Sequence, residues 1–331
     1  LKTIQQEKLN NQVAELDVAT SENNIQESIA QVYIQILYAA ESVKVNESTL
    51  QVSIAQRDRG QELLNAGSIA KSDFAQLEAQ VSTDRYQLVT AQATLEDYKL
   101  QLKQLLELDG ENEMNIYLPA LSDENVLAPL PTKKDVYIRA LSLRPEIEAS
   151  KLNVEASELG IGIAKSSYLP TISLSAGIGT NHTSGSDFTF GEQVKNGWNN
   201  SIGLSVSVPI FNNRQTKSAV QKAKLQYETS MLSLLDEQKT LYKTIEGLWL
   251  DANSAQQRYA AANEKLKSTQ ISYELISEQF NLGMKNTIEL LTEKNNLLQA
   301  QQEQLQAKYM AILNMQLLLS LIHISEPTRP Y

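Results

Sequence analysis

The stretch YLPTISLSAGI, residues 168–178, alternates apolar side chains with small polar ones. A second stretch, SIGLSVSVPIF at residues 201–211, repeats this alternation. A period of two residues places every second side chain on the same face of a β-strand, so each stretch predicts a strand with one apolar and one small polar face. The residues on the predicted apolar face are Ile172, Leu174, Ala176, Ile178, Ile202, Leu204, Val206 and Val208.

The two predicted strands have features that suit a lipid bilayer. Each has about ten residues, the length at which a tilted strand crosses a membrane. The flanking aromatic residues are Tyr168 and Phe211 at one end and Phe188, Phe190 and Trp198 at the other. The connection at 180–197 is rich in Gly, Ser, Thr and Asn, as in a long outer loop. We therefore predict a transmembrane β-hairpin whose apolar face contacts lipid; a soluble hairpin packed by that face is the alternative.

Long helical regions flank this hairpin, because apolar residues recur there every three, four or seven positions. The four series are Ile25, Ile29, Val32, Ile36 and Val43; Phe74, Val81, Leu88, Leu95 and Leu102; Val220, Tyr227, Leu234, Leu241 and Leu248; and Leu291, Leu298, Leu305, Ile312 and Leu319. A repeat of about 3.5 residues per turn predicts left-handed supercoiling. The proline-free segments 1–59 and 213–280 would each span roughly 90–100 Å, which is typical of a coiled coil or a helical tube.

These patterns predict a mainly α-helical protein with a small β part, built from long antiparallel coiled-coil hairpins. The predicted regions are a first helical hairpin at 1–108 with its tip near 60–73, an irregular segment at 109–132, a helical segment at 133–167, the β-hairpin at 168–211, a second helical hairpin at 212–319 with its tip near 278–290, and a tail at 320–331. The segment at 133–167 should break near Arg144 and Pro145. The tail reads SLIHISEPTRPY and resembles translated sequencing adapter, so we expect it to be non-native. A native unstructured C-terminus is the alternative.

The two predicted tips resemble each other. ELLNAGSIAKSDFAQL, residues 62–77, aligns with EQFNLGMKNTIELLTE, residues 278–293, at a constant offset of 216. Each tip has Asn-x-Gly, where glycine ends a helix by adopting positive φ, and an acid that favours the start of the next helix. This indicates an internal duplication, although any helical hairpin needs a turn of this kind. If the halves are duplicates, the first half lacks its strands, so we expect that the N-terminal part of the protein is missing.

The composition argues against several classes of protein. The formal net charge of −10 makes non-specific nucleic-acid binding unexpected, and the absence of cysteine excludes disulfides and thiolate metal sites. No apolar run reaches the roughly 18 residues of a transmembrane helix. The two histidines, His182 and His323, have no partner at metal-ligand spacing, and the carboxylates lie on helices with abundant polar faces. We expect no catalytic, cofactor-binding or metal-binding residue, and no enzymatic activity.

Two longer segments, together with the tips, carry a family resemblance. They are LRPEIEASKLNVEASELGIGIAKSSYLPTISLSAG at 143–177 and LSVSVPIFNNRQTKSAVQKAK at 204–224. They resemble the TolC-like outer-membrane efflux family, and the resemblance covers residues 1–319. It implies a homotrimer in the bacterial outer membrane, in which each protomer gives four strands to a shared 12-stranded β-barrel and its helices to a periplasmic α-barrel. This sequence contains two of those four strands.

The resemblance also implies a function. Family members are passive export ducts of tripartite efflux or type I secretion systems for small molecules or proteins, and they bind no cofactor. Their tips contact a periplasmic adaptor protein, which links them to an inner-membrane pump. The alternative is a structural coiled-coil rod or tethering protein without channel activity. The strand pair favours the channel, because a rod does not need lipid-facing strands.

The family's functional positions fall on the two tips. Glu289 matches an acidic residue that rings the periplasmic aperture, and Lys285 matches a basic residue in ties that hold it closed. Thr292 occupies the second acidic position, with Glu293 beside it, which puts a doubled acidic ring in doubt. The plain alternative for Glu289 is an acid that favours a helix N-terminus. The expected adaptor contacts, for which simple turn residues are the alternative, are Asn65, Gly67, Ser68, Ile69, Asn281, Gly283 and Met284, beside Lys285.

Overall fold

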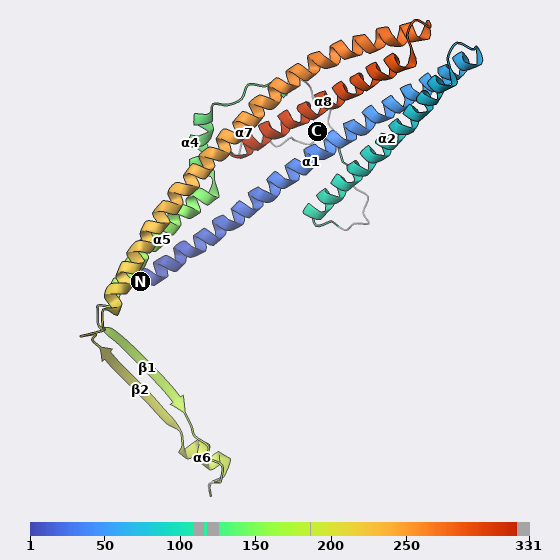
Figure 1. Cartoon of the computed structure of the whole chain (residues 1–331). Helices are drawn as coiled ribbons and strands as arrows, with labels where there is room; N and C mark the ends of the chain where they lie inside the picture. The colour runs from blue at the N-terminus through green and yellow to red at the C-terminus, as the bar shows by residue number, and fades with distance from the viewer. Residues whose placement is uncertain (109–115, 118–125, 186, 323–331) are drawn as a thin grey trace. The chain divides into compact units, whose positions relative to one another are not determined.

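The protein is mainly helical, as predicted (Figure 1). The computed structural model describes residues 1–108, 116–117, 126–185 and 187–322. Its helices and strands are α1 (Lys2–Asn65), α2 (Lys71–Leu105), α4 (Lys133–Leu143), α5 (Pro145–Ser166), β1 (Thr171–Gly179), α6 (Phe190–Asn196), β2 (Asn199–Ser207), α7 (Gln215–Asn281) and α8 (Thr287–Ser320). Most of the predicted irregular segment at 109–132, and the predicted tail beyond residue 322, lie outside the described residues. Within the described ranges, none of the helices combines the length and apolarity needed to cross a membrane.

The chain divides into two compact units. The first consists of Leu1–Leu16 and Glu148–Glu237, and the second of Asp17–Ile147 and Gln238–Tyr331. In the first unit the start of α1 lies against α5, where Gln6 Nε2 donates a hydrogen bond to the carbonyl of Ala156 at 2.9 Å. The two strands and α6 belong to the same unit.

β1 and β2 form an antiparallel pair. Ile172 lies opposite Val206, and Ser173 lies opposite Ser205. Because side chains alternate between faces, this register gathers Ile, Leu, Val and Ala on one face and Ser and Gly on the other. Every residue of both strands is exposed. The hairpin therefore presents a complete apolar face that nothing in the described chain covers.

The strands are shorter than predicted at the ends nearest the helices. The N–H of Leu169 donates to the carbonyl of Ser166 at 2.9 Å, in a turn that follows the end of α5. Residues 168 and 169 therefore belong to this turn, and β1 begins only at Thr171. At the other strand, β2 ends before Val208, because Pro209 follows and has no N–H to contribute to a strand ladder. Val208 therefore lies one residue beyond the strand in which it was predicted.

The break predicted in the helical segment lies between α4 and α5, at Arg144 before Pro145. The residue before a proline is driven out of helical geometry, and Arg144 has extended backbone angles of φ −74° and ψ 123°. Its guanidinium is nearly buried and pairs with Glu146 at 2.6 Å and with Glu27 on α1 at 3.3 Å. A charge-assisted contact thus fixes this break against the first hairpin.

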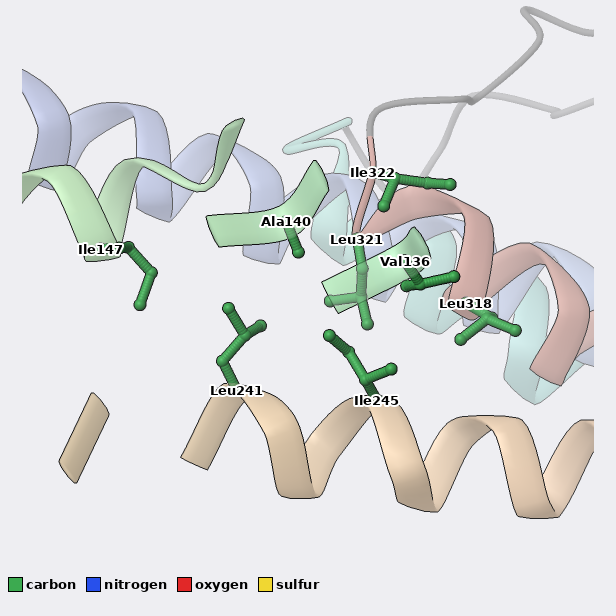
Figure 2. Packing of buried hydrophobic residues seen from close by; sticks show 8 residues of the cluster. All are labelled: Val136, Ala140, Ile147, Leu241, Ile245, Leu318, Leu321 and Ile322. Carbon is green, nitrogen blue, oxygen red and sulfur yellow. The ribbon is translucent and has the colours of Figure 1, made fainter. Parts of the chain in front are cut away.

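The main apolar cluster of the second unit lies where α4, α7 and the end of α8 meet. Its buried members are Val136, Ala140, Ile147, Leu241, Ile245, Leu318, Leu321 and Ile322. In Figure 2, Leu241 and Ile245 on α7 point toward Val136 and Ala140 on α4. Leu321 and Ile322 lie in the region assigned above to the non-native tail, yet they are part of this core. Removal of this apolar surface from water is the main force that holds α4 on α7.

The described part of the irregular segment is fastened to α7 by side-chain hydrogen bonds. Trp249 Nε1 donates to the carbonyl of Pro131 at 3.0 Å. Gln256 Nε2 donates to the carbonyls of Val126 at 3.0 Å and Ala128 at 2.8 Å. Val126 itself is fully buried. These bonds satisfy backbone carbonyls that have no secondary-structure partner.

The two helical hairpins are held together by smaller apolar contacts. Ile34 and Leu37 on α1 pack with Leu305 and Tyr309 on α8. Tyr38 and Tyr309 meet edge to face, with ring centroids 6.3 Å apart. Burial raises the pKa of Tyr309 to about 12, so its hydroxyl stays neutral at physiological pH.

Candidate functional site: the two hairpin tips

Both tips end their first helix with the same backbone geometry. Gly67 has a φ of +71° and Gly283 a φ of +73°, in the left-handed region that favours glycine. The hydrogen bonds are from Ser68 N–H to Leu63 C=O (2.8 Å) and Gly67 N–H to Leu64 C=O (3.0 Å), and from Met284 N–H to Gln279 C=O (2.9 Å) and Gly283 N–H to Phe280 C=O (2.9 Å). Each pair is a Schellman motif, which satisfies the last carbonyls of a helix. The first helix thus ends with the same backbone geometry at both tips, around the Asn-x-Gly that they share.

The second helix begins differently at the two tips. At α8, the side chain of Asn286 accepts from the N–H of Glu289 at 2.9 Å, and the Glu289 carboxylate accepts from the N–H of Asn286 at 3.2 Å. This reciprocal pair is a capping box. At α2, the Asp73 carboxylate accepts from the N–H of Ala70 at 3.4 Å, but alanine has no side-chain acceptor to return the bond. The start of α8 is therefore the more strongly capped of the two.

The carboxylate of Glu289, the predicted aperture residue, bonds to residues of the turn that precedes it. Lys285 Nζ donates to its carboxylate at 2.5 Å. The hydrogen bond from Lys285, followed by the bond from the N–H of Asn286, lowers the pKa of Glu289 below its ordinary value. The carboxylate therefore stays ionised in mildly acidic solution, and its charge is partly balanced by the lysine four residues earlier. In this geometry the Glu289 carboxylate also completes the capping box at the start of α8.

The other two predicted aperture residues point to different partners. Thr292 Oγ1 donates to the carbonyl of Ile288 at 2.7 Å within its own helix. Glu293 accepts from Ser272 Oγ on α7 at 3.0 Å. The structure thus groups Glu289 with Lys285, whereas Thr292 bonds to its own backbone and Glu293 ties the second hairpin together.

The tips present small and apolar surface to solvent. The predicted contact residues Asn65, Gly67, Ser68, Asn281, Gly283 and Met284 are exposed, and Ile69 is half-buried. Met284 is 70% exposed, and Leu282 and Ile288 beside it are 69% and 61% exposed. A Cβ atom added to Gly67 or Gly283 would meet no atom within 4 Å. The tips therefore have room for the close approach of another backbone, next to exposed apolar side chains.

A buried charged cluster behind the tips was missed from the sequence. Lys294 on α8 donates to the carboxylate of Asp84 on α2 and to the hydroxyl of Ser53 on α1, and that hydroxyl donates to Asp84. Asp84 and Lys294 are 1% and 3% exposed. Gln80 Nε2 donates to the remaining oxygen of Asp84 at 2.9 Å. One signal was available: Asp84 lies seven residues after the buried Leu77, so it occupies a seam position where apolar residues are expected.

The described part of the loop between the strands carries local structure. Thr189 and Glu192 form a capping box at the start of α6. Gln193 Nε2 donates to the carbonyl of Phe188 at 2.8 Å, which holds this turn closed. The flanking aromatic side chains Phe188, Phe190 and Trp198 are exposed.

The sequence matches a family model and several curated proteins. The family described as "Outer membrane efflux protein" matches residues 136–322, more than half of the 331-residue chain. The chain is 24% identical to outer membrane efflux protein BepC of Brucella suis biovar 1 (strain 1330) over 290 residues, which cover 87% of the chain and 60% of BepC. It is 23% identical to outer membrane protein TolC of Escherichia coli (strain K12) over 311 residues, which cover 91% of the chain and 62% of TolC. The chain thus spans about three fifths of the length of these relatives.

Solved structures share its fold. The outer-membrane channel OprN superposes with a TM-score of 0.79 at 20% sequence identity, covering 97% of this chain and 71% of OprN. The CmeC outer membrane channel of Campylobacter jejuni superposes with a TM-score of 0.79 at 18% identity, covering 97% of this chain and 67% of CmeC. The likeness extends over nearly all of the chain.

Proposed function

The chain belongs to the outer membrane efflux protein family, and from this membership we propose that the whole protein is the outer-membrane channel of a tripartite efflux or type I secretion system. It is a passive export duct for small molecules or proteins. Three copies form it, each giving four strands to a 12-stranded β-barrel and its helices to a periplasmic α-barrel. A periplasmic adaptor protein binds the tips and connects the duct to an inner-membrane pump, which supplies the energy.

The observation that carries the proposal is the uncovered β-hairpin. Its apolar face includes Ile202, 84% exposed, and Leu174, 76% exposed. Exposed apolar surface of this kind is unfavourable in water but favourable against lipid. The opposite face carries small polar residues such as Ser175 and Ser205, which suit a wet interior. One face for lipid and one for water is the pattern of a barrel wall.

The hairpin also needs further strands on both sides. An isolated two-stranded hairpin is marginally stable. In a bilayer each unpaired backbone N–H or C=O costs several kcal/mol, so β-strands are tolerated there only within a closed barrel. The outer edges of β1 and β2 must therefore pair with strands from outside the described chain, which supports assembly from several copies.

The tips support the adaptor contact. Gly67 and Gly283 leave open space where a side chain would stand, and the exposed Met284 adds apolar surface beside the second turn. A partner's helical turn gains close backbone packing there and buries that surface. We assign this contact to the adaptor protein.

Glu289 supports a cation-attracting aperture. Three ionised carboxylates around a narrow opening repel one another and attract cations. The lowered pKa of Glu289 keeps it ionised, while the ion pair with Lys285 reduces the net charge. Opening of the aperture that breaks this pair would expose the full acidic ring.

Charged substitutions on the two faces of β2 test the proposal in the full-length protein. A lysine on the lipid face costs about 2–4 kcal/mol at the middle of the bilayer, whereas a lysine facing water costs little. Leu204→Lys should strongly reduce insertion into liposomes, measured by co-flotation. The matched variant Ser205→Lys, one residue along, should insert as the wild type does and conduct with greater anion preference. Equal insertion of both variants would contradict the membrane assignment of the hairpin.

A further inference from the structure

The cluster of Asp84, Lys294 and Ser53 joins both hairpins in the buried seam between them. Asp84 belongs to the first hairpin and Lys294 to the second, 210 residues later in the chain. All three side chains are buried, and their hydrogen bonds close a ring in which the lysine and the serine hydroxyl both donate to the carboxylate. Beside them, Gln80 Nε2 on α2 donates to Asn295 Oδ1 on α8 at 3.4 Å.

A buried ion pair of this kind is a weak source of stability. The loss of hydration of both charges offsets their attraction, and apolar residues of similar volume stabilise such positions as well or better. A single unpaired charge in the same place is strongly unfavourable. The pair therefore adds little to the stability of the native packing. Its main effect is to disfavour any other axial register of the two hairpins, in which the charges would lose each other.

The alternative arrangements are evident from the positions one helical turn away. A slip of four residues along α8 would place Asp84 against Leu290 or Leu298, both buried and apolar. The apolar seam itself resists such a slip weakly, because apolar contacts are non-directional. The charges resist it strongly, because each would be left in a dry seam without a partner.

We propose that Asp84, Lys294 and Ser53 form a register latch, which fixes the axial position of the first helical hairpin on the second. A slip of one turn would displace one tip along the other by roughly 5 Å. In the wild-type chain the latch holds the tips at a single relative height. The consequence for adaptor binding rests on the proposed function, whereas the register of the hairpins does not.

The ionisation of the pair agrees with this role. Burial lowers the pKa of Lys294, while the hydrogen bond and the charge of Asp84 act in the opposite direction. The lysine thus depends on its partner to stay charged in the seam, and the two groups are matched to each other at one position.

Disulfide cross-linking measures the register directly, and none of the 331 residues is a cysteine that would compete with the introduced pair. Any cysteine elsewhere in the full-length protein is replaced by serine for this experiment. The pair Gln80→Cys and Asn295→Cys reports the native register, since these side chains are in contact. The pair Gln80→Cys and Gln299→Cys reports a slip of one turn. With Asp84, Lys294 and Ser53 unchanged, the native pair should form its disulfide at least tenfold faster than the slipped pair. Gln80→Cys is common to both pairs, so the loss of its hydrogen bond to Asp84 affects them equally.

The decisive comparison replaces the latch by apolar residues of similar volume. In Asp84→Leu with Lys294→Met, the tenfold preference should fall to about threefold or less, while the protein still folds. A matched control, Glu96→Leu with Lys99→Met, removes an exposed ion pair of α2 and should leave the preference unchanged. A tenfold preference that survives loss of the latch would overturn the proposal. The ratio of the two disulfide formation rates is measured without any transport assay. A failure of the proposed export function would therefore leave this test of the latch unaffected.

Discussion

Substitutions of Gly283 distinguish two roles of this residue, one in the turn and one in the contact with a partner. With φ at +73°, any residue with a Cβ is strained there, yet an added Cβ would touch nothing within 4 Å. The expected cost of Gly283→Ala is therefore purely conformational, about 1–2 kcal/mol. Asparagine visits this region more readily than other residues with a Cβ, so Gly283→Asn should cost less than Gly283→Ala.

A glycine in α7 provides a control whose replacement by alanine should stabilise the protein instead of destabilising it. Gly247 is inside the helix, without positive φ and with no atom within 4 Å of an added Cβ. Gly247→Ala should stabilise the protein by about 0.5–1 kcal/mol, because alanine loses less backbone entropy in a helix. Guanidinium unfolding of the full-length wild type and these two variants should rank Gly247→Ala as the most stable, the wild type next and Gly283→Ala as the least stable.

Export then distinguishes the two roles of the tip. If the glycine serves only the turn, export follows stability and Gly283→Asn exports normally. If a partner backbone approaches the tip closely, Gly283→Asn loses export although it is the more stable of the two Gly283 variants, and our account predicts this loss. Normal efflux in Gly283→Asn cells would refute the docking contact, and an unstrained Gly283→Ala would refute the backbone argument.

Three further predictions concern the core and the start of α8. Ile245→Ala should lower the free energy of unfolding by about 2–5 kcal/mol, because Ile245 is fully buried, whereas Leu250→Ala, at an exposed position of the same helix, should change it by less than about 0.5 kcal/mol. Asn286→Ala should cost about 1 kcal/mol by the same unfolding assay, because it removes the side-chain cap of α8. Lys285→Gln should increase the cation preference of the channel and Glu289→Gln should decrease it, measured as reversal potentials. Because the pKa of Glu289 is lowered in the folded protein, its charge is present above the ordinary pKa and is lost only as pH falls through the lower, folded value. In Lys285→Gln the cation preference should therefore be lost at a higher pH than in the wild type. An unchanged pH dependence of the cation preference would contradict the role assigned to Lys285.

The helices and strands were predictable because they depend on local periodicity. The seven-residue series through Val81 and Leu102 lies on a buried stripe of α2, and both residues are 5% exposed. The strand alternation lies in register across β1 and β2. Ile25, predicted in the same kind of seam, is 50% exposed, so periodicity alone did not place every residue of its series in the core.

The contacts between hairpins were not predictable in this way. Periodicity indicates that Asp84 and Lys294 lie near apolar seams, but it does not tell which charge on one helix meets which charge on another. Glu289 is a different case, because Asn286 three residues before it is a capping-box pattern that the sequence already contains. Side-chain partners follow from three-dimensional placement, which a single sequence does not encode locally.

Planar-bilayer recording of the full-length protein tests the central claim most directly. The account predicts discrete, steady conductance steps once the protein has inserted, with a cation preference that falls in Glu289→Gln. An electrically silent bilayer, with the protein demonstrably folded and bound to the same lipid, would contradict the claim that these helices and strands form an open passage.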